Sequence, residues 1–298
     1  MSFVPIEDLR TGGRSPSRQR LPPWFKVRLQ QGPDYRDIRQ VVDGLGLHTI
    51  CEEARCPNIW ECWNNRTATF LILGDICTRR CHYCSVTTGR PLAVDYDEPL
   101  RVAQAVQAMR LKHAVITSVN RDELDDGGAP VFAETIRQIR GLNPACTVEV
   151  LIPDFEGKET ALQTVAAERP EILNHNIETV ERLFPDIRPQ GKYRRSIQLL
   201  ERAKHMGMTT KSGLIIGMGE TADEIRAVMR DLRSVRCDIV TIGQYLQPTR
   251  QHLPVSRFYH PDEFAAFKAE GLALGFNHVE ASPLARSSYH AEQQVNGC

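Results

Sequence analysis

The chain has 298 residues, and its 37 Lys and Arg side chains balance its 37 Asp and Glu side chains. This zero formal charge gives no support for a whole-molecule attraction to nucleic acid or to an anionic membrane surface. No apolar run approaches the roughly 18 residues of a membrane span, and residues 1–20 lack the apolar segment of a secretory signal, so we expect a cytoplasmic protein, with an organelle as the alternative.

The first predicted element is a helix over residues 34–45, in which Tyr35, Ile38 and Val42 recur at helical spacing. It leads into a segment rich in cysteine, because six of the nine cysteines lie between positions 51 and 84. Disulfides are rare in reducing compartments, so such a cluster indicates metal or redox chemistry. The other three are expected to be ordinary core or terminal residues: Cys146, Cys237 and Cys298.

From residue 68 to residue 274 the pattern alternates between strand and helix. Short apolar runs predict strands over 68–74, 113–119, 146–152, 171–176, 212–219 and 238–243. Amphipathic stretches predict helices over 98–111, 129–140, 158–168, 193–206, 221–234 and 261–274, with Thr221 and Glu224 as a capping box. Six such alternations predict an α/β fold with parallel strands and right-handed crossovers. The pattern alone leaves a barrel and an open sheet as alternatives.

Polar residues mark the ends of these predicted strands. Active sites of such folds lie at the carboxyl ends of the strands. The candidates for contact with a small molecule are Thr117, Ser118, Asn120, Glu149, Asn174 and Asn176. The alternative for each is an ordinary loop residue, or for residues 174–176 a satisfied hydrogen-bond network. Lys211 is expected to form a structural ion pair.

Three cysteines follow the first predicted strand directly, as Cys77-x3-Cys81-x2-Cys84. Three thiolates on one tight loop can hold three irons of a cubane cluster and leave the fourth iron open to a small molecule. Zinc is the alternative, with His82 or a distant cysteine as fourth ligand. The position on a strand–helix loop favours the cluster, because zinc modules usually sit on small hairpins.

A second triplet, Cys51-x4-Cys56-x5-Cys62, precedes this strand. Three further cysteines at short spacing could hold a second cluster that lacks one ligand. A second zinc site or buried structural cysteines are the alternatives. Near the C-terminus stands Arg286-Ser287-Ser288-Tyr289, which on local grounds is a polar turn.

The loop Cys77–Cys84, with Tyr83 inside it, resembles the signature of the radical S-adenosylmethionine (SAM) enzymes. The longer segment CEEARCPNIWECWNNRTATFLILGDICTRRCHYC resembles the lipoyl synthase family nearly residue for residue. Segments 116–129, 173–180, 211–220 and 243–255 also resemble that family, so the likeness covers about residues 21–291.

The resemblance implies a partial (β/α)6 TIM-type barrel whose N-terminal and C-terminal extensions close the site. Residues 1–67 would form an arm and the auxiliary-cluster segment, residues 68–280 the barrel, and residues 281–298 a C-terminal segment. It also implies two [4Fe–4S] clusters, with Cys77, Cys81 and Cys84 binding the cluster that cleaves SAM. Cys51, Cys56 and Cys62 would bind an auxiliary cluster with Ser288, or alternatively Ser287, as its last ligand.

The activity that the resemblance implies is the insertion of sulfur at C6 and C8 of a protein-bound octanoyl-lysine, with the auxiliary cluster as sulfur donor. The expected partners are octanoylated lipoyl domains of 2-oxoacid dehydrogenases, the glycine cleavage H protein, a ferredoxin or flavodoxin, and an iron–sulfur carrier. A basic rim of Arg79, Arg80 and Arg121 is expected to dock the carrier domain. The alternatives are another sulfur-inserting radical SAM enzyme and a non-catalytic zinc-binding protein.

Overall fold

The computed structural model of the chain describes residues 21–25, 32–54, 56–64, 67–289 and 291–294. The expectations for residues 1–20 and for Cys298 lie outside these ranges. Among the described residues, every helix is too short or too polar to cross a lipid bilayer. The three-part division of the chain stays a prediction.

One sheet runs through the molecule in the order β1-β2-β5-β6-β7-β8-β9-β10. Its strands are β1 (His48–Thr49), β2 (Thr69–Ile72), β5 (His113–Ser118), β6 (Thr147–Leu151), β7 (Ile172–Asn174), β8 (Thr210–Ile216), β9 (Ile239–Gln244) and β10 (His278–Ser282). All neighbours are parallel except β1, which pairs antiparallel with β2. The strands between β2 and β9 confirm the predicted alternation, and β10 adds a strand that the pattern did not predict.

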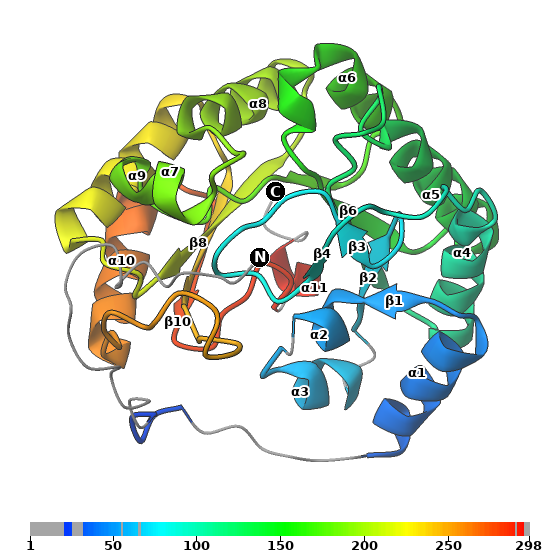
Figure 1. Ribbon diagram of the computed structural model, residues 1–298, viewed down its shortest axis with the longest axis horizontal. Helices are drawn as coiled ribbons and strands as arrows, with labels where there is room; N and C mark the ends of the chain where they lie inside the picture. Colours follow the sequence, from blue (N-terminus) through cyan, green and yellow to red (C-terminus); the bar gives the residue numbers. More distant parts are fainter. Residues whose placement is uncertain (1–20, 26–31, 55, 65–66, 290, 295–298) are drawn as a thin grey trace.

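Helices cover the outside of this sheet and follow its strands in turn. They are α4 (Glu98–Met109), α5 (Ala129–Leu142), α6 (Glu159–Ala167), α8 (Tyr193–His205), α9 (Ala222–Ser234) and α10 (Pro261–Ala273). Figure 1 shows them as an outer arc with the strands inside it. The predicted capping box at the start of α9 is present, since the Thr221 side chain accepts from the Glu224 backbone N–H. The architecture is a partial TIM-type barrel, as expected.

Apolar packing between helices and sheet holds the arc together in two hydrophobic clusters. One joins the inner faces of α4, α5 and α6 to β2, β5 and β6, and the other joins α8, α9 and α10 to β8 and β9. In α4, for example, Val102, Val106 and Met109 are at most 1% exposed. Such spacing places one apolar stripe of the helix against the sheet, which explains why the periodicity located these helices correctly.

The N-terminal segment occupies the open side of the arc. It consists of α1 (Pro33–Gly44), α2 (Ile50–Glu53) and α3 (Ile59–Asn64), and Figure 1 shows α2 and α3 in the space between β10 and β1. Tyr35 of α1 stacks on Trp60 of α3 with ring centroids 4.7 Å apart. The first cysteine triplet is therefore carried by short helices beside the barrel.

The remaining short elements lie on connections. They are β3 (Ile76–Cys77), β4 (Thr87–Thr88), α7 (Phe184–Ile187), α11 (Ala291–Gln294) and the 3-10 turns Phe155–Gly157 and Glu181–Leu183. The pairing of β3 with β4 closes the loop that contains the second cysteine triplet.

Candidate active site

A cavity of about 440 Å³ lies at the carboxyl ends of the strands, where the predicted site should be. The register aligns these ends, because Ser118 pairs with Ile72, Thr117 with Leu151, and Leu151 with Asn174. Loops after β5, β6, β7 and β9 contribute to its walls, together with residues 213–215 of β8, both cysteine segments and residues 285–288. Residues from position 50 to position 288 of the chain therefore line one cavity.

The second cysteine triplet lines this cavity with all three side chains. The Cys77 Sγ accepts hydrogen bonds from the backbone N–H groups of Arg79 (3.4 Å) and Asn120 (3.3 Å). The Cys84 backbone N–H donates to the Cys81 carbonyl at 3.1 Å, which turns the loop back on itself. Hydrogen bonds to sulfur stabilise a thiolate and tune an iron–sulfur cluster.

Burial makes four of the cysteine thiols poor acids. It raises the pKa of Cys84 and of Cys51 to about 12, and it also raises the pKa of Cys81 and of Cys56. A cation bound beside these thiols would favour their deprotonated form, and the iron of a cluster would supply that charge. Among the described residues, no three His, Cys, Asp or Glu side chains converge closely enough to hold a single metal ion. Thiolates are the donors that iron–sulfur clusters take, so the chemistry of the three thiols at the cavity fits such a group.

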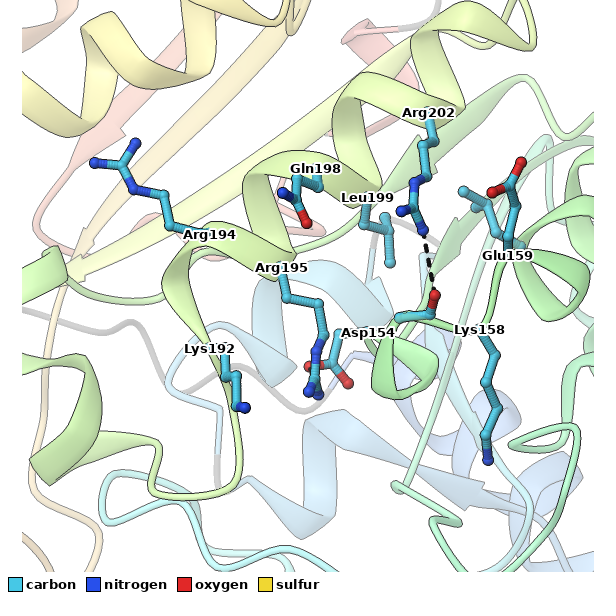
Figure 2. A pocket seen from close by; sticks show the side chains of 11 residues that line it. Asp154, Lys158, Glu159, Lys192, Arg194, Arg195, Gln198, Leu199 and Arg202 are labelled. Atoms are coloured by element: carbon cyan, nitrogen blue, oxygen red, sulfur yellow. Dashed lines mark hydrogen bonds and ion pairs between the residues drawn. The ribbon is translucent and has the colours of Figure 1, made fainter.

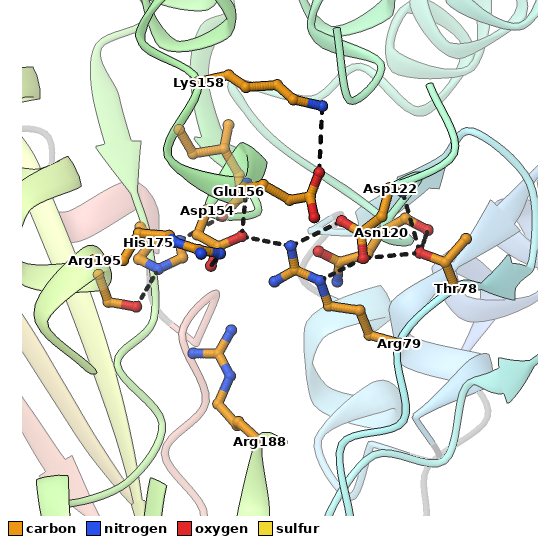
Figure 3. A network of polar contacts seen from close by, with 12 residues as sticks. Thr78, Arg79, Asn120, Asp122, Asp154, Glu156, Lys158, His175, Arg188 and Arg195 are labelled. Carbon is orange, nitrogen blue, oxygen red and sulfur yellow. Dashed lines mark hydrogen bonds and ion pairs between the residues drawn. The ribbon is translucent and has the colours of Figure 1, made fainter. Parts of the chain in front are cut away.

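Arg79 holds the second cysteine loop to two neighbouring strand ends. Its Nε and Nη2 donate to the Asp122 carboxylate at 2.7 and 2.8 Å, and Nη2 lies 2.6 Å from Asp154 Oδ1. Figure 3 shows this guanidinium between the two carboxylates. Arg79 and Arg121 are each 4% exposed, so the expectation that they form a basic docking rim is wrong. Both guanidiniums are used to bind loops inside the protein.

The C-terminal segment lies against the first cysteine triplet. The Asn58 Nδ2 donates to the Leu284 carbonyl at 2.7 Å, and the Tyr289 hydroxyl donates to Glu61 Oε1 at 3.1 Å. Gly243 of β9 permits this approach, because a Cβ there would lie 2.1 Å from the Ala285 carbonyl oxygen. Ser287 and Ser288 both line the same cavity as Cys51 and Cys56, so both stay candidates for the serine ligand. Cys62 is partly buried and packs against the core.

Four of the six predicted polar contacts lie on the cavity wall. They are Thr117, Ser118, Asn120 and Asn176. Ser118 Oγ, Asn120 Oδ1 and Asn176 Oδ1 are buried without a hydrogen-bond partner among the described residues. Unpaired buried polar atoms are costly, and a polar ligand in the cavity would satisfy them.

Glu149 and Asn174 do not lie at the cavity, which corrects the prediction made for them. Glu149 is 0% exposed and sits 3.0 Å from Lys211 Nζ, which is also 0% exposed. Its carboxylate accepts from Asn174 Nδ2 at 2.9 Å, and His113 Nε2 lies 3.7 Å away. The two residues belong to a buried polar cluster between strands, and the expected structural ion pair of Lys211 is confirmed.

Sequence reasoning missed Glu178 and Arg188, which line the cavity near Cys81. Burial raises the pKa of Glu178, while Arg188 and hydrogen bonds from Asn176 and Tyr83 oppose this rise. Glu178 has a φ of +68°, and its backbone is fixed by 2.9 Å hydrogen bonds to Gly213 and Ile215. These two hydrogen bonds hold a non-glycine residue in the left-handed conformation at the cavity wall. No local sequence pattern marks either residue.

His175 is expected to make the protein less stable below neutral pH. Burial lowers its pKa from 6.5 to about 4, and its ring lies 2.8 Å from the Ile152 carbonyl and 2.9 Å from Ser196 Oγ. The His175 ring in the unfolded chain binds a proton more readily than the buried ring does. The stability that the neutral, buried ring contributes is therefore fully present above pH 6.5, and it is lost as the pH falls from 6.5 towards 4. The loss amounts to about 3 kcal/mol at most.

Urea unfolding at several pH values measures this effect. His175→Gln should flatten the dependence of unfolding free energy on pH between 6.5 and 4, whereas the exposed His205→Gln should leave it unchanged. Equal slopes for wild type and His175→Gln would contradict the assignment.

Comparisons with known proteins agree with this site. Residues 71–232 match the Radical SAM superfamily, and residues 7–56 match the N-terminal domain of lipoyl synthase of the Radical SAM family. The lipoyl synthase of Rubrobacter xylanophilus is 60% identical over 280 residues, covering 93% of this chain and 87% of the relative. That of Shouchella clausii is 56% identical, covering 93% and 91%.

Solved structures share the fold at low sequence identity. A methylornithine synthase gives a TM-score of 0.54 at 12% identity, covering 86% of each chain. SuiB of Streptococcus suis, bound to S-adenosylmethionine, gives 0.57 at 8% identity, covering 75% of this chain and 53% of that one. The sequence identity to the curated relatives, the matched domains and the cavity with its cysteines lead to one conclusion: the chain belongs to the lipoyl synthase family of radical SAM enzymes.

Proposed function

We propose that this chain inserts two sulfur atoms at C6 and C8 of an octanoyl group that is amide-linked to a lysine of a carrier protein. One observation carries the proposal: five of the six cysteines of the two triplets, with Ser287 and Ser288, line a single cavity. A site that must both generate a radical and deliver sulfur to it needs both groups within reach of one substrate chain.

Membership of the radical SAM superfamily brings one [4Fe–4S] cluster and SAM to the site. We assign that cluster to Cys77, Cys81 and Cys84, and a second [4Fe–4S] cluster to Cys51, Cys56, Cys62 and Ser288. When bound, these groups supply a carbon radical for hydrogen abstraction and the sulfur that replaces the hydrogen. Acid–base catalysis by side chains cannot reach an unactivated C–H bond.

The residues of the cavity would then bind SAM and exclude water. Ser118, Asn120 and Asn176 present unpaired polar atoms to its amino acid, ribose or adenine groups. Thr117 has a different role, because its hydroxyl already donates to the Leu151 carbonyl at 2.9 Å and so fixes the end of β5. Apolar side chains on the same walls suit an alkyl chain: Ile50, Leu71, Val86, Leu214 and Leu246.

The partners follow from this chemistry. Octanoylated lipoyl domains of 2-oxoacid dehydrogenases and the glycine cleavage H protein would present the substrate. A ferredoxin or flavodoxin would supply electrons, and an iron–sulfur carrier would rebuild the auxiliary cluster. We propose a cytoplasmic location for these encounters.

An anaerobic assay tests the proposed function. Reconstituted protein, dithionite, SAM and an octanoyl-lysyl peptide should yield 5′-deoxyadenosine and a peptide that gains two sulfur atoms by mass. Cofactor cleavage without sulfur gain would point to another sulfur-inserting radical SAM enzyme. A colourless protein that contains zinc and no iron would instead indicate a non-catalytic zinc-binding protein.

Ser288→Ala is expected to separate the two half-reactions. Loss of a ligand from the auxiliary cluster should reduce sulfur insertion strongly and leave formation of 5′-deoxyadenosine close to wild type. Ser287→Ala is the matched control, because its hydroxyl lines the same cavity. Mass spectrometry of the peptide measures sulfur insertion. If Ser287→Ala loses it and Ser288→Ala does not, the ligand is Ser287.

A further inference from the structure

A second hollow, of about 310 Å³, opens between the first turns of α6 and α8. Figure 2 shows Lys158, Lys192, Arg195 and Arg202 around it, together with Asp154 and Glu159. We call this hollow the α6–α8 groove. Four side-chain cations thus face two carboxylates there, although the whole chain has zero formal charge. Arg194 does not add to this excess, because its guanidinium binds Glu181 at 2.9 Å.

Two of the four cations keep their charge uncompensated by a carboxylate. Lys192 forms no ion pair with any described residue, and Arg202 donates only to the Gly157 carbonyl at 3.2 Å. Lys158 lies 3.3 Å from Glu156, and Arg195 lies 3.1 Å from Asp154. Asp154 is shared with Arg79, so one carboxylate serves two guanidiniums. The carboxylate of Glu159, which forms no ion pair with a described residue, offsets one of these charges, so the groove keeps a net positive charge that favours an acidic partner.

The helix ends add to this potential. Both α6 and α8 start at the groove, and neither Lys158 nor Lys192, which precede them, caps its helix with a side-chain hydrogen bond. Free N–H groups and the helix dipole place partial positive charge at such ends.

The floor of the groove is linked to the radical-generating loop by two contacts. Asp154 Oδ1 lies 2.6 Å from Arg79 Nη2, and the Arg79 backbone N–H donates to Cys77 Sγ at 3.4 Å. Figure 3 shows Asp154 between Arg195, on the groove side, and Arg79. A protein seated in the groove would thus be separated from a cluster thiolate by only two side chains.

Building on the proposed function, we propose that the α6–α8 groove docks an acidic one-electron carrier protein of the flavodoxin type. In each docking event the carrier gives up one electron and is thereby oxidised by one electron. That electron is consumed in breaking one sulfonium C–S bond of SAM, which gives methionine and the adenosyl carbon radical. The contacts to the cysteine loop favour an electron carrier over the octanoyl carrier domain as occupant.

Charge reversal in the groove tests this proposal on the reconstituted holoenzyme. The variant is Lys158→Glu with Lys192→Glu. Its matched control is Arg230→Glu with Lys268→Glu, two exposed cations on α9 and α10, on the side of the arc away from α6 (Figure 1). The probe is a purified acidic flavodoxin. Its Kd in the oxidised form is measured by calorimetry, and the KM of its reduced form from 5′-deoxyadenosine release.

The groove variant should raise both constants by about tenfold or more, because opposite charges no longer steer the encounter. In this variant the Kd and KM should also depend less on salt concentration, since salt screens exposed charges and fewer attractive charges remain. Release of 5′-deoxyadenosine with dithionite, which needs no docking, should match wild type. The control variant should match wild type in every measurement.

Three results would overturn the proposal. They are an unchanged KM and Kd for flavodoxin, an equal loss in the control variant, and a raised KM for the octanoyl carrier domain without one for flavodoxin. Failure of the proposed function gives a different result, because wild type with dithionite would then release no 5′-deoxyadenosine at all.

Discussion

Cys81→Ala is expected to abolish 5′-deoxyadenosine formation, whereas Cys56→Ala is expected to retain it and to lose sulfur insertion. In the proposed assignment each triplet supplies the three thiolates of its own cluster, so removing one thiolate should empty one site and leave the other filled. Each variant should therefore keep roughly half of the iron and sulfide of wild type. Iron and sulfide analysis, 5′-deoxyadenosine release and peptide mass measure the three quantities.

Cys146→Ala is the control for loss of a buried thiol outside both triplets. Cys146 is 6% exposed and belongs to the hydrophobic core, so its variant should keep both clusters and both half-reactions. Loss of SAM cleavage in Cys56→Ala would show that the two triplets do not act separately. Full iron content in Cys81→Ala would refute the assignment of the second triplet.

Lys211→Met is expected to lower the free energy of unfolding by about 3–5 kcal/mol, because it leaves the Glu149 carboxylate buried without its cation. Both partners are 0% exposed. Burial by itself would raise the pKa of Glu149, but attraction to Lys211, the nearby His113 ring and the hydrogen bond from Asn174 lower it. The carboxylate is therefore charged in the folded protein and depends on Lys211. Urea unfolding measures the change.

Two further variants decide whether the buried charge causes this loss. Lys211→Met combined with Glu149→Gln should recover much of the stability, since no unpaired charge is then buried. Arg194→Met removes a partner from an exposed pair, with side chains 65% and 53% exposed, and should cost less than about 1 kcal/mol. A Lys211→Met variant that is as stable as wild type would contradict the role assigned to this pair.

The sequence by itself determined the order of the main elements. Strands such as β5 are buried on both faces, which produces continuous apolar runs, and the helices carry an apolar stripe on one side only. β10 was missed because His278–Ser282 contains few apolar residues and pairs only with β9 at the edge of the sheet. β8 begins earlier than predicted, at Thr210, because Thr210 and Lys211 are buried polar residues.

The two cysteine triplets were also readable from the sequence, since their short spacing marks them, and their assignment as cluster ligands stays a prediction. Only the tertiary structure decided which distant side chains meet them. Leu284 lies beside Asn58 across 226 positions of sequence, and Glu178 and Arg188 reach the cavity without any local signal.

The presence of a polar residue at a predicted strand end also did not show whether its side chain faces the cavity or another side chain. Ser118 faces the cavity, whereas Glu149 points to Lys211 and Arg79 points inward to Asp122 and Asp154. A charge beside a strand end is stabilised either by a ligand or by a countercharge from another strand. Sequence patterns report only neighbours along the chain. The packing of the strands sets the distances between these charges, and it therefore determined which of them are paired inside the protein.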